Sequence, residues 1–104
     1  MTAIKFIEIW CKSICKISEA INAKSHLELR SKEVFDHSVA LNVRLPELGK
    51  ELDFIAWESG NAELSLLYSG GQIEHVHIDN IDKPEVLGPT LDRITEFLFP
   101  DKLA

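Results

Sequence analysis

Long apolar runs are missing from this chain of 104 residues. No segment approaches the roughly 18 consecutive apolar residues that a membrane-spanning helix needs. The first residues, MTAIKFIEIWCKSICK, carry Lys5, Glu8 and Lys12 among their apolar positions, so they lack the uninterrupted apolar core of a secretory signal. These absences predict a protein of the cytoplasm without a membrane partner.

Cysteine is scarce as well. The two cysteines, Cys11 and Cys15, lie four positions apart, a spacing that makes them neighbours on a helix but does not favour a structural disulfide. Reduced thiols that pack beside a helix are the simplest interpretation, and reduced thiols also fit the cytoplasm.

Positive charge is the third feature in short supply. The chain has 11 Lys and Arg against 17 Asp and Glu, a formal net charge of -6. A nucleic-acid-binding protein needs a basic surface to meet phosphates, so the composition argues against a nucleic-acid partner and suits a basic protein partner. The imbalance is local: residues 1–30 carry five basic and three acidic residues, whereas residues 46–82 carry one basic and eight acidic residues.

Helical periodicity occurs at both ends of the chain. Residues 3–23 predict one helix whose buried stripe recurs every three or four positions, with Cys11 and Cys15 beside it. Asp82 and Glu85 resemble a capping box that starts a second helix, the pair Gly88-Pro89 predicts a kink or two short helices, and Pro100 ends the element. The predicted stripes consist of Ile7, Trp10, Ile14, Ile17 and Ile21 in the first helix, and of Leu87, Leu91, Ile94 and Leu98 in the second.

Between the helices, apolar and polar residues alternate as in half-buried strands. Five such segments are separated by polar or glycine-containing turns, near residues 31–36, at PELGK, at SGN and at Gly70-Gly71. Because short turns join antiparallel neighbours, the last three segments predict a meander. We expect strands over residues 25–31, 37–45, 51–58, 62–69 and 72–79.

The pattern indicates an α+β fold in a single domain over residues 1–104. An antiparallel sheet of about five strands is flanked by N- and C-terminal helices, and two apolar helical stripes require one apolar sheet face. We therefore expect both helices on the same face. The other face is then open to solvent or to a partner.

The stretch EHVHID, residues 74–79, raises the question of a metal site. On a strand, His75, His77 and Asp79 point to one side, and paired imidazoles bind zinc or iron in many proteins. A metal site also needs further ligands and groups that orient the rings, and neither His26 nor His37 can be placed beside them from sequence. A solvated or partner-binding face is the preferred interpretation, with no metal and no cofactor.

Catalytic signatures are weak. A reactive cysteine needs an exposed, electropositive surrounding, which packing beside a helix stripe does not provide. The nucleophile-elbow pattern G-x-S-x-G is absent, and the acidic residues are too numerous to single out an acid–base pair. We therefore expect a protein that is not an enzyme.

The acidic residues fall on consecutive predicted strands, where like charges repel and lower stability. A cationic partner would neutralise them, and complementary charge also speeds association. Trp57 has two possible orientations: inward it belongs to the core, and outward with Asp53 it becomes an aromatic anchor for a partner. The predicted partner-binding residues are Asp53, Trp57, Glu58, Glu63, Glu74, His75, His77 and Asp79.

The segment FIAWESGNAELSLLYSGGQIEHVHID and the helix after it resemble the second half of the TriTu-type immunity proteins. In that family a strand ends in a Trp-x-Ser-Gly-like turn, and a second strand, a glycine turn, a histidine-bearing strand and a helix follow. The resemblance covers about residues 52–99. The matching residues are Trp57, Glu58, Ser59, Gly60, Gly70, Gly71 and His75 or His77.

The resemblance implies a non-enzymatic antitoxin of the cytoplasm. Such proteins bind the C-terminal domain of an Rhs-type polymorphic toxin, of the kind associated with type VI secretion, and the toxin is an ADP-ribosyltransferase that modifies elongation factor Tu. The implied mechanism is occlusion of the toxin's active site by a monomer in a 1:1 complex. The alternative function is a small acidic secretion chaperone of the type III kind, a class that is usually homodimeric and exposes apolar grooves.

Overall fold

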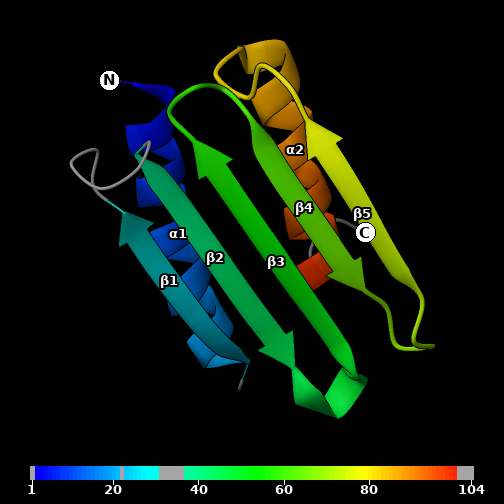
Figure 1. Ribbon diagram of the computed structural model, residues 1–104. Coiled ribbons are helices and arrows are strands. Elements are labelled where there is room, and N and C mark those ends of the chain that lie inside the picture. Colours follow the sequence, from blue (N-terminus) through cyan, green and yellow to red (C-terminus); the bar gives the residue numbers. More distant parts are fainter. Residues whose placement is uncertain (1, 22, 31–36, 101–104) are drawn as a thin grey trace.

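The computed structural model describes residues 2–21, 23–30 and 37–100 (Figure 1). A helix comes first, five strands follow, and a second helix ends the described chain. The turn predicted near residues 31–36 lies outside the described residues. The elements are α1 (Ala3–Ala20), β1 (Lys24–Arg30), β2 (Ser38–Leu45), a short 3-10 helix (Pro46–Leu48), β3 (Lys50–Trp57), β4 (Ala62–Leu67), β5 (Ile73–Ile78) and α2 (Pro84–Leu98).

The five strands form one antiparallel sheet in which every strand pairs with its neighbours in sequence. Tight turns enforce this order. The turn between β3 and β4 requires glycine at position 60, where φ is 104° and a Cβ would lie 3.0 Å from Asp82 Oδ1. The meander predicted from the alternating segments is confirmed, and it extends to all five strands.

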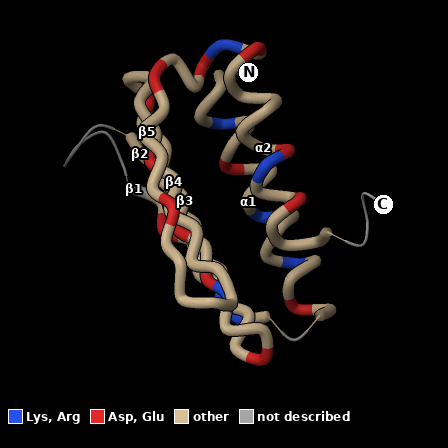
Figure 2. The backbone as a smooth tube through the Cα atoms, turned by 90° about the vertical axis from the view of Figure 1, so that its right-hand side faces the viewer, with Lys and Arg blue, Asp and Glu red and all other residues tan. Residues whose placement is uncertain are grey.

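Both helices cover the same face of the sheet, as the edge-on view shows (Figure 2). Helix α1 packs over β1, β2 and β3. Helix α2 lies toward the other edge, where the rings of Phe97 and Tyr68 meet edge to face with centroids 5.3 Å apart and Lys50 Nζ donates to the Phe97 carbonyl at 2.7 Å. The predicted α+β architecture, with helices on one face only, is confirmed.

The core lies between the helices and this covered face. Alternate residues of the three central strands point into it, because successive side chains of a strand face opposite ways. Phe54 is the largest side chain that is almost fully buried. The core side chains of these strands are Val39, Leu41, Val43, Leu45, Leu52, Phe54, Ala56, Ala62, Leu64 and Leu66.

The stripe predicted for α1 is wrong. Ile7 and Ile14 are buried as expected, but Ile17 and Ile21 are 48% and 44% exposed. The residues that face the core are Ile4, Ile7, Cys11, Ile14 and Ser18. Helix α1 carries apolar residues around more than half its circumference, so its sequence offers two stripes, and the fit against the sheet selects the less apolar one. Cys11 therefore lies within the buried stripe rather than beside it.

Two features of α1 follow from this orientation. Burial raises the pKa of the Cys11 thiol to about 12, so the thiolate is not accessible at neutral pH. Glu8 is nearly buried and its Oε2 atom accepts hydrogen bonds at 3.1 Å from both Lys12 and Lys5. These two ammonium groups, Lys12 foremost, lower the pKa of Glu8. Both cysteines are free, as expected.

Helix α2 differs from the prediction at its start, and it excludes one of the two alternatives for its middle, the two short helices. Its first residue is Pro84, which suits the first helical position, but the cap is Lys83 and no side chain caps the helix. The capping box predicted at Asp82 and Glu85 is therefore wrong. The helix also runs through Pro89 as one element, because neighbouring residues bury their apolar side chains in the core on both sides of the proline.

Candidate functional site

The face of the sheet away from the helices is called the open face here. Its side chains alternate with those of the core, and the strand register places them in rows that cross the sheet. Carboxylates outnumber cations, since only Lys24 and Arg44 are basic among its described side chains. The open face comprises Lys24, His26, Glu28, Ala40, Asn42, Arg44, Glu51, Asp53, Ile55, Trp57, Glu63, Ser65, Leu67, Ile73, His75 and His77, with Asp79 at its edge.

A cluster of two carboxylates and two histidines forms where β4 and β5 pair. His77 Nδ1 lies 2.7 Å from Glu63 Oε1, and His77 Nε2 lies 3.0 Å from Asp79 Oδ1. His75 Nε2 lies 2.8 Å from Glu63 Oε2. The register explains the contacts, because Glu63 is directly opposite His77 in the ladder. Glu63 therefore stands between the two imidazoles and Asp79 closes the row.

The contacts within the cluster shift the pKa values of His77 and Glu63. Both ring nitrogens of His77 face carboxylates, so the imidazolium, with two N–H donors, satisfies both contacts. Glu63 first, and then Asp79, raise the pKa of His77. In return, hydrogen bonding from His77 lowers the pKa of Glu63. The pairing offsets part of the like-charge repulsion that neighbouring carboxylates would otherwise suffer.

A second polar group occupies the centre of the open face. Asn42 Nδ2 donates to Asp53 Oδ1 at 2.7 Å and to Glu51 Oε2 at 2.9 Å. Arg44 Nε lies 3.6 Å from the same Glu51 oxygen. One amide thus holds two carboxylates of β3 in place, and these carboxylates present a fixed negative charge to whatever meets the sheet.

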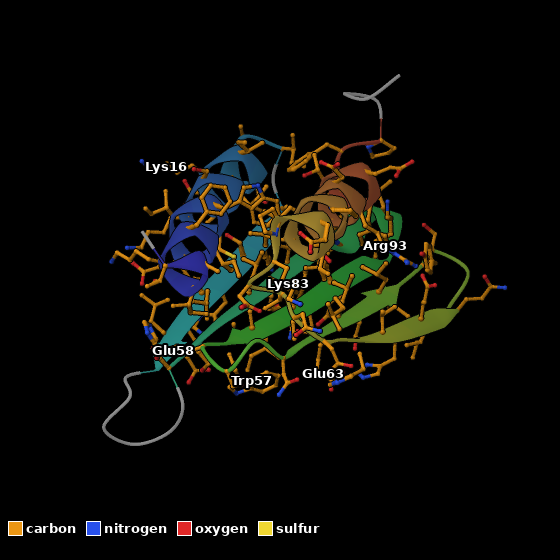
Figure 3. All side chains as sticks on the ribbon, turned by 90° about the horizontal axis from the view of Figure 1, so that it is seen from above. Lys16, Trp57, Glu58, Glu63, Lys83 and Arg93 are labelled. Atoms are coloured by element: carbon orange, nitrogen blue, oxygen red, sulfur yellow. The ribbon has the colours of Figure 1, made fainter. Side chains whose placement is uncertain are left out.

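Trp57 lies on the open face, which decides between the two orientations left open by the sequence. Its strand neighbours Phe54 and Ala56 are buried under the helices, and the indole projects from the opposite side (Figure 3). Ile55 is half-buried on the same side. The outward orientation therefore places an aromatic side chain and an aliphatic one next to the carboxylates of the open face.

Two of the predicted partner-binding residues lie elsewhere. Glu74 points to the helix-covered side, where it pairs with Arg93 of α2 and accepts a hydrogen bond from the Tyr68 hydroxyl at 3.0 Å. Arg93, the larger influence, and Tyr68 lower its pKa. Glu58 lies in the turn after β3 at the end of the sheet, with Oε2 4.0 Å from His37 Nδ1 (Figure 3).

The other six predicted residues come together on the open face or at its edge. They are Asp53, Trp57, Glu63, His75, His77 and Asp79. The sequence interpretation missed Asn42, Glu51 and Ser65, which connect them. A signal existed for Glu51 and Ser65, which have the same strand parity as Asp53 and Glu63, but cross-strand partners such as Asn42 depend on register, and register is not visible in one sequence.

Ser65, His75 and Glu63 have the composition of a nucleophile triad, and Ser65 Oγ lies 2.7 Å from His75 Nδ1. Their setting favours contact over catalysis. Ser65 is in the middle of a strand that pairs on both sides, so its backbone N–H groups serve the sheet rather than an oxyanion. The His75 side chain is 59% exposed, which leaves water free access to the group.

A metal centre is not supported by the arrangement of the described residues. Among them, no group of three or more His, Cys, Asp or Glu side chains is placed to hold a metal ion. The three residues of the EHVHID stretch do share one side, as predicted, but the imidazole of His77 contacts Glu63 and Asp79 through its two nitrogens, and His75 contacts Ser65 and Glu63.

Comparisons with protein-family models, curated proteins and solved structures found no match. None of the helices formed by the described residues has the length and apolar character required to cross a membrane.

Proposed function

We propose that this protein is an immunity protein that binds a cognate polymorphic toxin domain and neutralises it by occluding the active site. The open face is the docking surface. The toxin is an ADP-ribosyltransferase that modifies elongation factor Tu, as the resemblance over residues 52–99 implies. The observation that carries the proposal is an uncovered sheet face that presents both hydrogen-bonded carboxylates and an outward-facing Trp57.

Charge supports this assignment. Five carboxylates of the open face and its edge stand against two cations among the described side chains. Opposite charge on a partner would relieve their repulsion and steer the two surfaces together, which raises association rates more than it raises affinity. A toxin domain with a basic surface has the complementary chemistry.

The aromatic anchor supports it as well. Tryptophan is enriched among the few interface residues that carry most of the binding free energy. Trp57 is flanked by half-buried Ile55 and by the edge of the acidic cluster at Glu63. A partner that covers Trp57 excludes water from the indole while its basic side chains reach the carboxylates of the same face.

The decisive experiment uses the toxin domain encoded beside the gene for this protein. Equimolar purified protein should abolish transfer of labelled ADP-ribose from NAD to elongation factor Tu, and co-expression should restore growth of cells that produce the toxin. A matched variant, Trp57→Ala, should require a large excess to give the same inhibition, while Glu47→Lys, a change away from the open face, should behave as wild type.

Two results would change the assignment. Undiminished label transfer at saturating protein excludes neutralisation of that toxin. Stable binding to an unfolded secreted chain, with no effect on any toxin, would favour the alternative of a secretion chaperone.

A further inference from the structure

The outer surface of the helix layer carries an apolar stripe that the fold does not bury. The stripe consists of Phe6, Ile9, Ile17 and Ile21, on and just after α1, and adjoins Trp10, which is partly buried against the core. The four side chains of the stripe are 44% to 48% exposed. Contiguous exposed apolar side chains on a small domain indicate a surface that meets another molecule.

Two rows of charge run along the same surface. At 100° per residue, positions separated by seven and then four fall in one line on a helix. Lys5, Lys12 and Lys16 form such a line on α1 and are called the lysine row. Glu85, Asp92 and Glu96 form one on the outward side of α2 and are called the acidic row. Both rows have the same spacing of seven and four residues.

The order of these features across the surface is defined by the structure. Lys16 projects from the side of α1 that is away from α2 (Figure 3). Since the buried stripe faces the sheet, the helical angles place the exposed apolar stripe on the outer side of α1 toward α2. Across the helix layer, the spatial order is therefore the lysine row, the apolar stripe and then the acidic row.

Helices α1 and α2 also run in the same direction, with both N-termini at one end of the molecule (Figure 1). A two-fold axis parallel to the helices would turn one copy over onto another without reversing that direction. Each lysine row then faces the other copy's acidic row, and the two apolar stripes meet along the axis.

We propose that this surface is a homodimer interface, in which the apolar stripes of two copies pack together and each lysine row pairs with the acidic row of the other copy. The charged side chains of the two rows are free to form these ion pairs between copies. Within the described residues, Lys16 and all three members of the acidic row form no ion pair, and Lys5 and Lys12 share the single carboxylate of Glu8, which leaves a net positive charge.

The projected area of the surface is that of a small interface. Two helices side by side, each about 10 Å wide and about 25 Å long, project a face of about 500 Å², and a corrugated helix surface has more accessible area than its projection. A standard interface buries about 800 Å² on each partner. The open faces of the two sheets then point away from each other, so a toxin complex contains two copies of each chain instead of the 1:1 complex expected from sequence.

The first test is the mass of the wild-type protein by size-exclusion chromatography with light scattering. A dimer has twice the 11.7 kDa mass of one chain. Ile17→Glu, in the apolar stripe, should weaken dimerisation at least tenfold, whereas Ile73→Glu, an equally radical change at a 73% exposed position on the open face, should not. A wild-type monomer at about 100 μM, well above a typical micromolar Kd, overturns the proposal.

The second test exchanges the charges. Variant A carries Lys5→Glu, Lys12→Glu and Lys16→Glu, and variant B carries Glu85→Lys, Asp92→Lys and Glu96→Lys. Each alone should be monomeric with an unchanged circular-dichroism spectrum, because its rows repel. Mixed A and B should form a 1:1 heterodimer, because both pairs of rows are then opposite in charge.

This mixture distinguishes charge pairing from misfolding, since misfolded variants would not recover by mixing. Dimers of A alone and of B alone overturn the pairing of the rows, and growth into larger assemblies overturns the closed two-fold arrangement. A monomer whose apolar stripe instead binds vesicles of anionic phospholipid overturns the proposal and assigns the surface to a lipid interface. None of these outcomes depends on a toxin.

Discussion

The two faces of the sheet use the same strands for opposite purposes. On β3, Phe54 and Ala56 are buried beneath the helices, while Asp53, Ile55 and Trp57 line the open face. The covered face derives its stability from apolar burial, and its one carboxylate on β5, at position 74, is held by Arg93 and Tyr68. The open face holds its carboxylates by hydrogen bonds and leaves aromatic surface uncovered. The polar side chains of the open face are therefore held in place by hydrogen bonds although no helix covers them.

The largest expected effect separates the two faces by stability. Phe54→Ala removes a fully buried ring from the covered face and should lower the free energy of unfolding by about 3–5 kcal/mol. Ile55→Ala, one residue along the same strand on the open face, should cost about 1 kcal/mol because the side chain is only half-buried. Urea denaturation of both variants measures the contrast. Equal losses would mean that the open face is as enclosed as the core.

The next effect separates the two sides by binding, with the two tryptophans as matched probes. Trp57→Ala should weaken toxin binding by about 2 kcal/mol, roughly 30-fold, as expected for a buried interface anchor. Trp10→Ala, on the helix side of the molecule, should leave the affinity of the folded protein unchanged. Isothermal titration calorimetry gives both values. A larger loss for the helix-side variant would move the docking surface to the helix layer.

Charge on the open face should affect association more than dissociation. Asp53→Lys combined with Asp79→Lys should slow association with the toxin about tenfold at low ionic strength, because complementary fields accelerate encounter. The difference should shrink as salt is added. Glu47→Lys makes a single charge reversal off the sheet and serves as the control in stopped-flow measurements. A slowing that persists unchanged in high salt would contradict steering by charge.

The smallest effect is a pH dependence within the acidic cluster. The raised pKa of His77 gives a stabilisation that is complete below its ordinary value of 6.5 and is lost as the pH rises through the raised pKa. The lowered pKa of Glu63 gives one that is complete above its ordinary value of 4.5 and is lost as the pH falls through the lowered pKa. Both stabilising contributions are therefore complete between pH 4.5 and pH 6.5, the ordinary pKa values of Glu63 and His77.

His77→Gln should therefore lower the Tm more at about pH 5.5 than at a pH above the raised pKa of His77, where this stabilisation is lost. The shift should be small because the groups are exposed and screened by solvent. His26→Gln, also on the open face, is the control in thermal unfolding followed by circular dichroism. A variant that matches wild type at the lower pH would contradict the pairing.

Strand alternation made much of the sheet predictable. The period of two in residues 37–45 predicted the buried residues of β2, and short turns predicted the meander, but the same period in residues 51–58 left open which side of β3 faces the core. The same period bears on Glu74 and His75, which are adjacent on one strand. Their side chains therefore point to opposite faces of the sheet and do not both face one partner. The position of Glu74 was thus readable in principle.

The orientation of α1 was not readable. Its sequence contains two apolar stripes, and choosing the more apolar one placed Ile17 and Ile21 in the core. Periodicity ranks stripes by hydrophobicity, whereas the sheet selects the stripe whose shape fits between β1, β2 and β3. As a result, the other apolar stripe of α1 remains exposed on the surface of the protein.

The sequence by itself determined the order of elements, the alternation within strands and the acidic character of residues 46–82, because these follow from local periodicity and composition. Tertiary structure alone decided three further matters: the side to which Trp57 points, the partners of Glu63 and Asn42, and the stripe of α1 that stays outside. Each depends on register or packing between segments far apart in the chain. A shift of one residue in a strand, or of about 100° around a helix, reverses the answer.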